Sequence, residues 1–133
     1  MKVTTRFVLG FFLISFILAS CSLVHTAQAK KHLSQGMELE QQGQLQLAMD
    51  EYSLAIELDP TLALAFYQRG SAHAALEDYI QAVDDLDQVL ALDPEHAEAF
   101  NLRGLACIKL EEFDRAIEDL NKAIELQALI VPR

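Results

Sequence analysis

Apolar side chains recur at helical spacing along most of this chain. Between residues 79 and 92 they fall at positions i, i+3, i+4 and i+7, and a weaker stripe of the same kind runs over 63–76. Pro94 cannot continue a helix and ends the second stripe. No alternation of the kind that marks a β-strand reaches a useful length. The pattern predicts two amphipathic helices joined by a tight turn at Glu77 and Asp78.

The same pattern returns every 34 residues. Three sets of residues show this period: Gly36, Gly70 and Gly104; Ala48, Ala82 and Ala116; Leu58, Leu92 and Leu126. The period divides the chain into three units, 29–62, 63–96 and 97–130, and the second and third share twelve identical residues in register. A glycine inside a helix costs about 1 kcal/mol relative to alanine. Its return in every unit predicts a close approach by a neighbouring helix.

The repeated letters carry a family resemblance. The second and third units read A-F-x-x-R-G-x-A and then L-E-x-[YF]-x-x-A-[VI]-x-D-L, and L-D-P ends the first two units. This pattern resembles the tetratricopeptide repeat (TPR) family over residues 29–130. The resemblance implies an all-α fold, an α-solenoid of three helix–turn–helix repeats wound into a right-handed superhelix. Many TPRs carry glycine at the turn, where this chain has Gly43, Glu77-Asp78 and Glu111-Glu112.

An arginine and an aspartate change together between the units. The second and third units carry an arginine just before the repeat glycine and an aspartate sixteen residues after that arginine; the first unit has lost both. The residues are Arg69 and Asp85, Arg103 and Asp119, and, in the first unit, Gln35 and Glu51. We therefore predict a structural ion pair within each of the last two repeats.

The first twenty residues have the layout of an export signal. Lys2 and Arg6 precede the uncharged apolar stretch 7–19, as in the n-region and h-region of a signal peptide. The following Leu18-Ala19-Ser20-Cys21 resembles the lipobox of bacterial lipoproteins. That resemblance implies a signal peptide over 1–20, lipidation of Cys21, and a linker over 21–28 that tethers the repeats to a membrane.

Two other interpretations of the N-terminus stay open. Ala27-Gln28-Ala29 forms an A-x-A site, so ordinary signal peptidase could cut after Ala29 and release a soluble, secreted protein. The uncharged stretch 7–24 also reaches the lower end of transmembrane length and could remain as an uncleaved anchor. In each case the repeats are exported or tethered, facing the periplasm or another extracytoplasmic compartment.

Composition and charge exclude several classes of function. Twenty acidic residues outnumber ten basic ones, giving a formal net charge of −10, whereas a nucleic-acid binder needs a basic face. The four histidines and two cysteines have no metal-ligand spacing, and Cys107 falls on a packed helix face. No phosphate-binding loop, nucleophile elbow or zinc motif is present. We expect no enzyme activity, no metal and no cofactor.

The TPR resemblance implies a concave groove lined by the first helix of each repeat. The groove positions are Leu33, Met37, Tyr67, Ser71, Ala74, Asn101, Leu105, Ile108 and Lys109. The alternative for some of them is packing between repeats. TPRs that grip the C-terminal carboxylate of chaperones use basic and asparagine side chains where this chain has Leu33, Met37, Glu98 and Leu102. We expect no carboxylate clamp, and a partner with apolar anchors and basic flanks.

The C-terminal edge is a second candidate surface. Repeat arrays need a polar cap at each end. The last predicted helix instead carries Ile124, Leu129, Ile130 and Val131, with no further helix to cover them. We expect self-association or the docking of a partner there.

These features predict a non-catalytic adaptor that is exported, tethered to a membrane and bound to a protein or peptide partner. The alternative is an accessory or assembly factor of a membrane complex, held by an uncleaved N-terminal transmembrane helix.

Overall fold

A computed structural model describes residues 24–130, and all of its regular structure there is helical. The first helix covers 24–41 and is followed by five more. They are α2 (Leu45–Leu58), α3 (Ala63–Ala75), α4 (Tyr79–Leu92), α5 (Ala97–Lys109) and α6 (Phe113–Ile130). The all-α prediction is confirmed, and the predicted helices over 63–76 and 79–92 correspond to α3 and α4.

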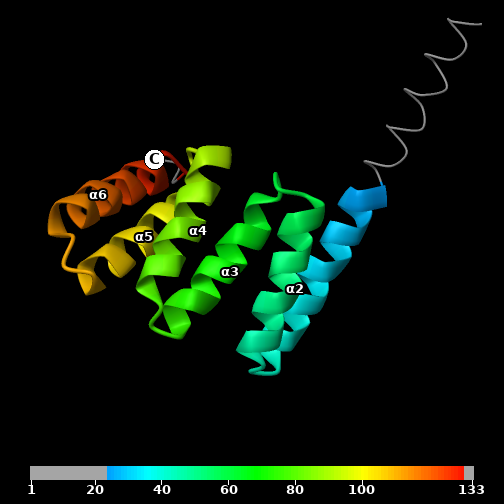
Figure 1. The fold of residues 1–133 in the computed structure, drawn as a ribbon. Coiled ribbons are helices and arrows are strands. Elements are labelled where there is room, and N and C mark those ends of the chain that lie inside the picture. The colour runs from blue at the N-terminus through cyan, green and yellow to red at the C-terminus, as the bar shows by residue number, and fades with distance from the viewer. Residues whose placement is uncertain (1–23, 131–133) are drawn as a thin grey trace, which may run out of the picture.

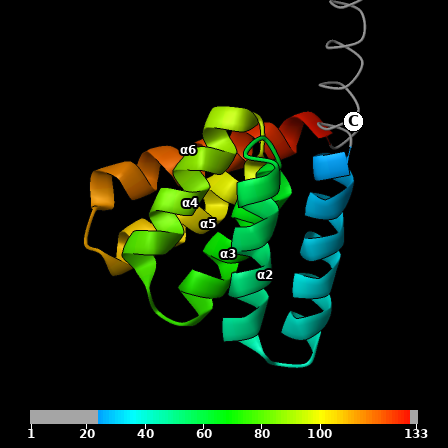
Figure 2. The same cartoon turned by 45° about the vertical axis from the view of Figure 1, so that its right-hand side comes forward.

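The helices stand in a row, each packed on the next (Figure 1). Among α2 to α6, the contacts are most extensive within the hairpins α3–α4 and α5–α6, and each of α2 and α4 packs on the first helix of the following hairpin. Helix α3 also contacts α5, so the first helices of these two hairpins lie next to each other. The first helix lies at one end of the row and α6 at the other (Figure 1), and the turned view shows the first helix standing beside α2 (Figure 2). This is a helical solenoid, in which each repeat contacts its neighbours.

The core consists of small clusters between adjacent helices. One joins Leu33, Ala48, Tyr52, Ala55 and Ala65; another joins Phe66, Leu86, Val89, Leu90 and Ala99; a third joins Val83, Ala106, Cys107 and Ala116. Alanine supplies many of these positions because it lets helix backbones approach closely. Stability therefore accumulates from hairpin to hairpin.

The repeated glycines lie where helices approach closely, as predicted. A Cβ built at Gly70 would lie 3.1 Å from the Cβ of Asp85, and one at Gly104 would lie 2.9 Å from Cγ of Leu120. Both neighbours belong to the second helix of the same hairpin. Glycine thus brings the two helices of each hairpin into contact.

The turns inside the hairpins use a left-handed backbone residue. Its φ is 75° at Gly43, 64° at Glu77 and 62° at Glu111. Only the first turn has the residue type that adopts this conformation at no steric cost. The other two turns hold a glutamate there, so packing of the hairpins imposes the conformation.

The first helix begins earlier than the sequence indicated. Residues 24–28, predicted to be part of a linker, are helical, and Ala29 inside the same helix is fully buried. Residues 1–23 lie outside the described part of the chain, and with them the signal peptide, the lipobox and Cys21. Within 24–130, none of the helices has the length and hydropathy needed to cross a bilayer.

Candidate protein-binding surfaces

Eight of the nine predicted groove residues reach the surface of the first helices. Those on the first helix, α3 and α5 form what we call the first-helix surface: Met37, Tyr67, Ser71, Ala74, Asn101, Leu105, Ile108 and Lys109. Met37, Leu105 and Ile108 are large apolar side chains that stand exposed on it. The surface therefore combines exposed apolar anchors with polar Asn101 and Lys109.

The ninth residue, Leu33, does not belong to this surface. Its side chain is only 7% exposed and packs in the core cluster with Tyr52 and Ala65. The prediction that it lines the groove is wrong, because this position of the first helix faces α2 rather than solvent. Met37, one helical turn later, is exposed and stays on the surface.

Tyr67 of this surface stacks on a histidine at the start of α5. Its ring stacks on His96 with centroids 5.0 Å apart and planes at 25°. Nδ1 of His96 accepts a hydrogen bond from the Ala99 N–H at 3.2 Å and so caps the start of α5. Burial, followed by the charge of Glu98, raises the pKa of Tyr67. Sequence reasoning missed this pair because histidine is an uncommon N-cap residue.

The structure brings together both predicted arginine–aspartate pairs. Nε and Nη2 of Arg69 donate to the two carboxylate oxygens of Asp85 at 2.9 and 2.7 Å. The corresponding distances from Arg103 to Asp119 are 2.8 and 2.6 Å. Both aspartates are buried, and this two-pronged geometry is the strongest that arginine offers to a carboxylate. The pairs fix each first helix against its own second helix.

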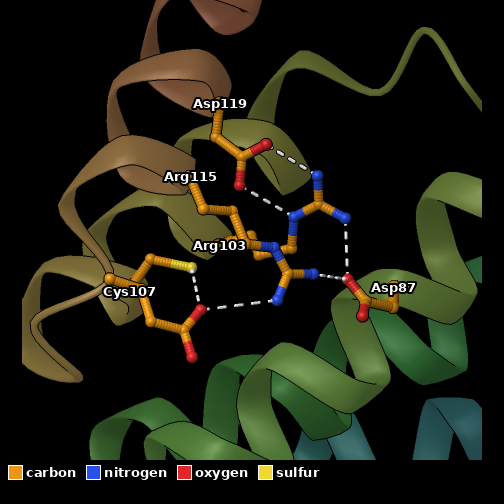
Figure 3. Close-up of polar contacts among 6 residues, drawn as sticks. Asp87, Arg103, Cys107, Arg115 and Asp119 are labelled. Carbon is orange, nitrogen blue, oxygen red and sulfur yellow. Dashed lines mark hydrogen bonds and ion pairs between the residues drawn. The ribbon is translucent and has the colours of Figure 1, made fainter.

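Each arginine also makes a contact that the sequence analysis missed. Nη1 of Arg69 donates to Oγ of Ser53 at 2.9 Å. Nη1 of Arg103 donates to Oδ1 of Asp87 at 2.7 Å (Figure 3). Ser53 and Asp87 stand at the same place in successive units, one unit before the arginine. The arginines therefore also join neighbouring repeats.

In the last repeat these contacts extend into a network (Figure 3). Arg115 of α6 donates to Asp87 at 2.6 Å, and its other nitrogen lies 3.6 Å from Glu112. Sγ of Cys107 lies 3.8 Å from the same Glu112 carboxylate. Burial raises the pKa of the Cys107 thiol, which therefore resists forming the reactive thiolate.

The first unit has its own pairing. Nδ1 of His32 lies 2.7 Å from Glu51, which replaces the repeat aspartate, and the Tyr52 hydroxyl donates to Glu40 at 2.6 Å. The nearby shallow hollow is lined by Gln35, Glu38, Leu39, Gln42 and Glu51. Across residues 24–130, no group of three or more His, Cys, Asp or Glu is arranged to hold a metal ion.

Helix α6 presents an apolar surface at the C-terminal edge. Ile124 and Leu129, which the sequence placed there, are exposed, and so are Phe113 and Ile117. The side chain of Ile130 and all of Val131 lie outside the described part of the chain. Apolar side chains are thus exposed on two surfaces, one on the first helices and one on α6.

The matches to known protein families cover the same repeats. A family model described as tetratricopeptide repeat matches residues 62–128, and another, described as TPR repeat, matches residues 36–77. Among curated protein sequences there is no match.

Several solved structures share the fold. The second TPR domain of Spaghetti (RPAP3), bound to an HSP90 peptide, is 25% identical with a TM-score of 0.78, covering 80% of this chain and 98% of that one. The first TPR domain of human RPAP3 is 26% identical with a TM-score of 0.72, covering 76% and 80%. MamA is 29% identical with a TM-score of 0.73, covering 75% of this chain and 58% of MamA. With its repeats, paired helices and family match, this chain belongs to the tetratricopeptide repeat family.

Proposed function

We propose that this chain is a non-catalytic adaptor that binds a protein or peptide segment on its first-helix surface. The observation that carries the proposal is the exposure of Leu105 and Ile108 on α5, which contacts α3, together with that of Met37 on the first helix. Exposed apolar side chains on a rigid helical scaffold provide anchors for a peptide or a partner helix. The peptide complex of the Spaghetti (RPAP3) domain, which is similar to this chain, supports the same use of the fold.

The ligand differs from the acidic HSP90 peptide SRMEEVD of that complex. The positions where chaperone-binding TPRs place basic and asparagine side chains hold Met37, Glu98 and Leu102 here, besides buried Leu33. With a formal net charge of −10, the chain repels an acidic peptide. A segment with apolar anchors and basic flanks fits better.

Affinity capture from membranes tests the proposal. Leu105→Asp on α5 places a charge among the apolar anchors, whereas Leu47→Asp is a matched control, since Leu47 is similarly exposed on α2. We expect wild type and Leu47→Asp to capture the same partner, and Leu105→Asp, Tyr67→Ala and Asn101→Ala to lose most of it. Equal capture by all five proteins would contradict the proposal.

We also propose that the adaptor is exported and held at a membrane by lipidated Cys21. The basic start, the apolar stretch over 7–19 and the four residues ending at Cys21 support this. Cleavage before Cys21 leaves helix 24–41 whole, whereas cleavage after Ala29 would remove several residues of that helix, including a buried alanine. The alternative is an accessory factor of a membrane complex, anchored by uncleaved residues 7–24.

Metabolic labelling with palmitate separates these anchors. A lipoprotein incorporates the label and loses it on Cys21→Ala. An unlabelled chain that keeps its N-terminus supports the transmembrane anchor, and an unlabelled chain that begins at Lys30 supports secretion.

A further inference from the structure

The exposed face of α6 carries apolar residues at positions whose equivalents on α4 are buried. Val83 and Leu90 of α4 are 6% and 9% exposed, while Ile117 and Ile124, one unit later on α6, are 59% and 65% exposed. The apolar character of these positions is kept from unit to unit, but their burial is lost. This face of α6 therefore has the composition of a helix–helix interface.

The earlier repeats indicate what kind of helix fits this face. Val83 clusters with Ala106 and Cys107 of α5, and Leu90 clusters with Ala99 of the same helix. Each covering helix carries small residues and one aromatic at equivalent places: Ala65, Phe66 and Ala72 in α3, and Ala99, Phe100 and Ala106 in α5. A helix suited to α6 thus presents alanines and an aromatic ring on one face.

The same comparison predicts a basic residue on that helix. Arg69 of α3 reaches Ser53 on the preceding second helix, and Arg103 of α5 reaches Asp87. The next residue in this series is Asn121, which is exposed on α6. Beside it, acidic side chains follow one flank of the apolar stripe at helical spacing: Asp114, Glu118 and Glu125, the last of which pairs with Lys122.

We propose that this face of α6, centred on Ile117, Asn121 and Ile124, docks an amphipathic helix of a partner protein. The apolar side of that helix carries small residues and an aromatic, and its flank carries lysine or arginine that meets Asn121 and the acidic side chains. The α6 surface lies on the last helix of the row, whereas the first-helix surface lies on the first helix, α3 and α5.

A second copy of the chain fits this face poorly. Head-to-tail stacking would set the first helix on α6, and that helix carries Lys31, His32, Gln35 and Glu38 where α3 has alanines, a phenylalanine and an arginine. Lys31 and Glu38 would take the places of the alanines that pack on Leu90 and Val83, so charged side chains would be buried against Ile124 and Ile117. Pairing two α6 helices antiparallel about a two-fold axis would bring their acidic flanks together, because that symmetry places like flanks on the same side.

Two synthetic peptides test the proposal directly. Both form a helix with the same alanine and phenylalanine face, and they differ in carrying either lysine and arginine or glutamate on the flanks. Binding to the full chain is followed by fluorescence anisotropy. The basic peptide is expected to bind at least about tenfold more tightly than the acidic one. Added salt should reduce this difference in affinity, because it screens the charges.

Variants of the chain test whether the basic peptide binds to this face of α6. The double substitution Ile117→Asp and Ile124→Asp should abolish binding of the basic peptide. Ile80→Asp, at a similarly exposed residue of α4, should leave it unchanged. These results would hold even if the first-helix surface had no partner.

Three results would overturn the proposal. They are equal affinity for the two peptides, binding that survives the double substitution, and a dimer in sedimentation velocity that Ile124→Asp dissociates. The last would assign the face to a second copy.

Discussion

At the scale of single residues, the repeat arginines connect sequence to packing most clearly. The arginine–aspartate pairs were predictable because both partners change together between units. Their third contacts, to Ser53 and Asp87, were not, because those partners belong to the preceding unit and differ in chemistry. The burial of Leu33 was missed for a related reason: position in a repeat gives the face of a helix only to within a fraction of a turn.

Removal of one such arginine should destabilise the fold strongly. Arg103→Ala leaves buried Asp119 without its two hydrogen-bond donors and removes one of the two arginines that bind Asp87. Breaking a buried pair on one side costs about 3–5 kcal/mol. Lys122→Ala breaks the exposed pair with Glu125 and should cost less than about 1 kcal/mol. Urea unfolding followed by circular dichroism measures both, and equal losses would contradict the assigned role of Arg103.

Cys107 should react slowly in the folded protein. Burial raises the pKa of its thiol, so that at a given pH a smaller share is the nucleophilic thiolate. In a Cys21→Ala background, modification by a disulfide reagent at pH 8 should be slow in buffer and fast in urea. Rapid modification of the folded chain would show that the thiol is accessible and ionised.

At the scale of helices, the 34-residue period located the hairpins because each repeats a full pattern of apolar stripe, glycine and turn. The start of the first helix was not predicted, since residues 24–28 lie before the repeat register begins. The turns were placed correctly, but their strain was visible only in the backbone: Glu77 and Glu111 hold φ values that favour glycine.

Glycine at these turns should therefore stabilise the hairpins. Glu77→Gly and Glu111→Gly relieve the left-handed conformation and should each raise the free energy of unfolding by about 0.5–1 kcal/mol, after the entropic cost of glycine. Gly43→Ala is the reverse test: no atom within 4 Å would meet its new Cβ, so any loss comes from the backbone alone. Thermal unfolding measures all three, and a lower midpoint for both glycine variants would refute the argument.

At the scale of the whole molecule, the solenoid gives the chain two kinds of end. The first helix ends the row with polar side chains, whereas α6 ends it with exposed isoleucines. Between them, the first-helix surface offers apolar anchors on an acidic chain. The sequence predicted the architecture, because the 34-residue period locates each pair of helices. The identity of a partner depends on a few variable side chains, and so it was not predictable.

Photo-cross-linking in native membranes tests the central claim, binding through the first-helix surface, most directly. A photoreactive phenylalanine analogue replaces Leu105 on α5 or, as the control, Leu47 on α2. The adaptor proposal predicts a discrete adduct of higher mass from position 105 and none of that mass from position 47. The same adduct from both positions, or no adduct from position 105, would contradict it.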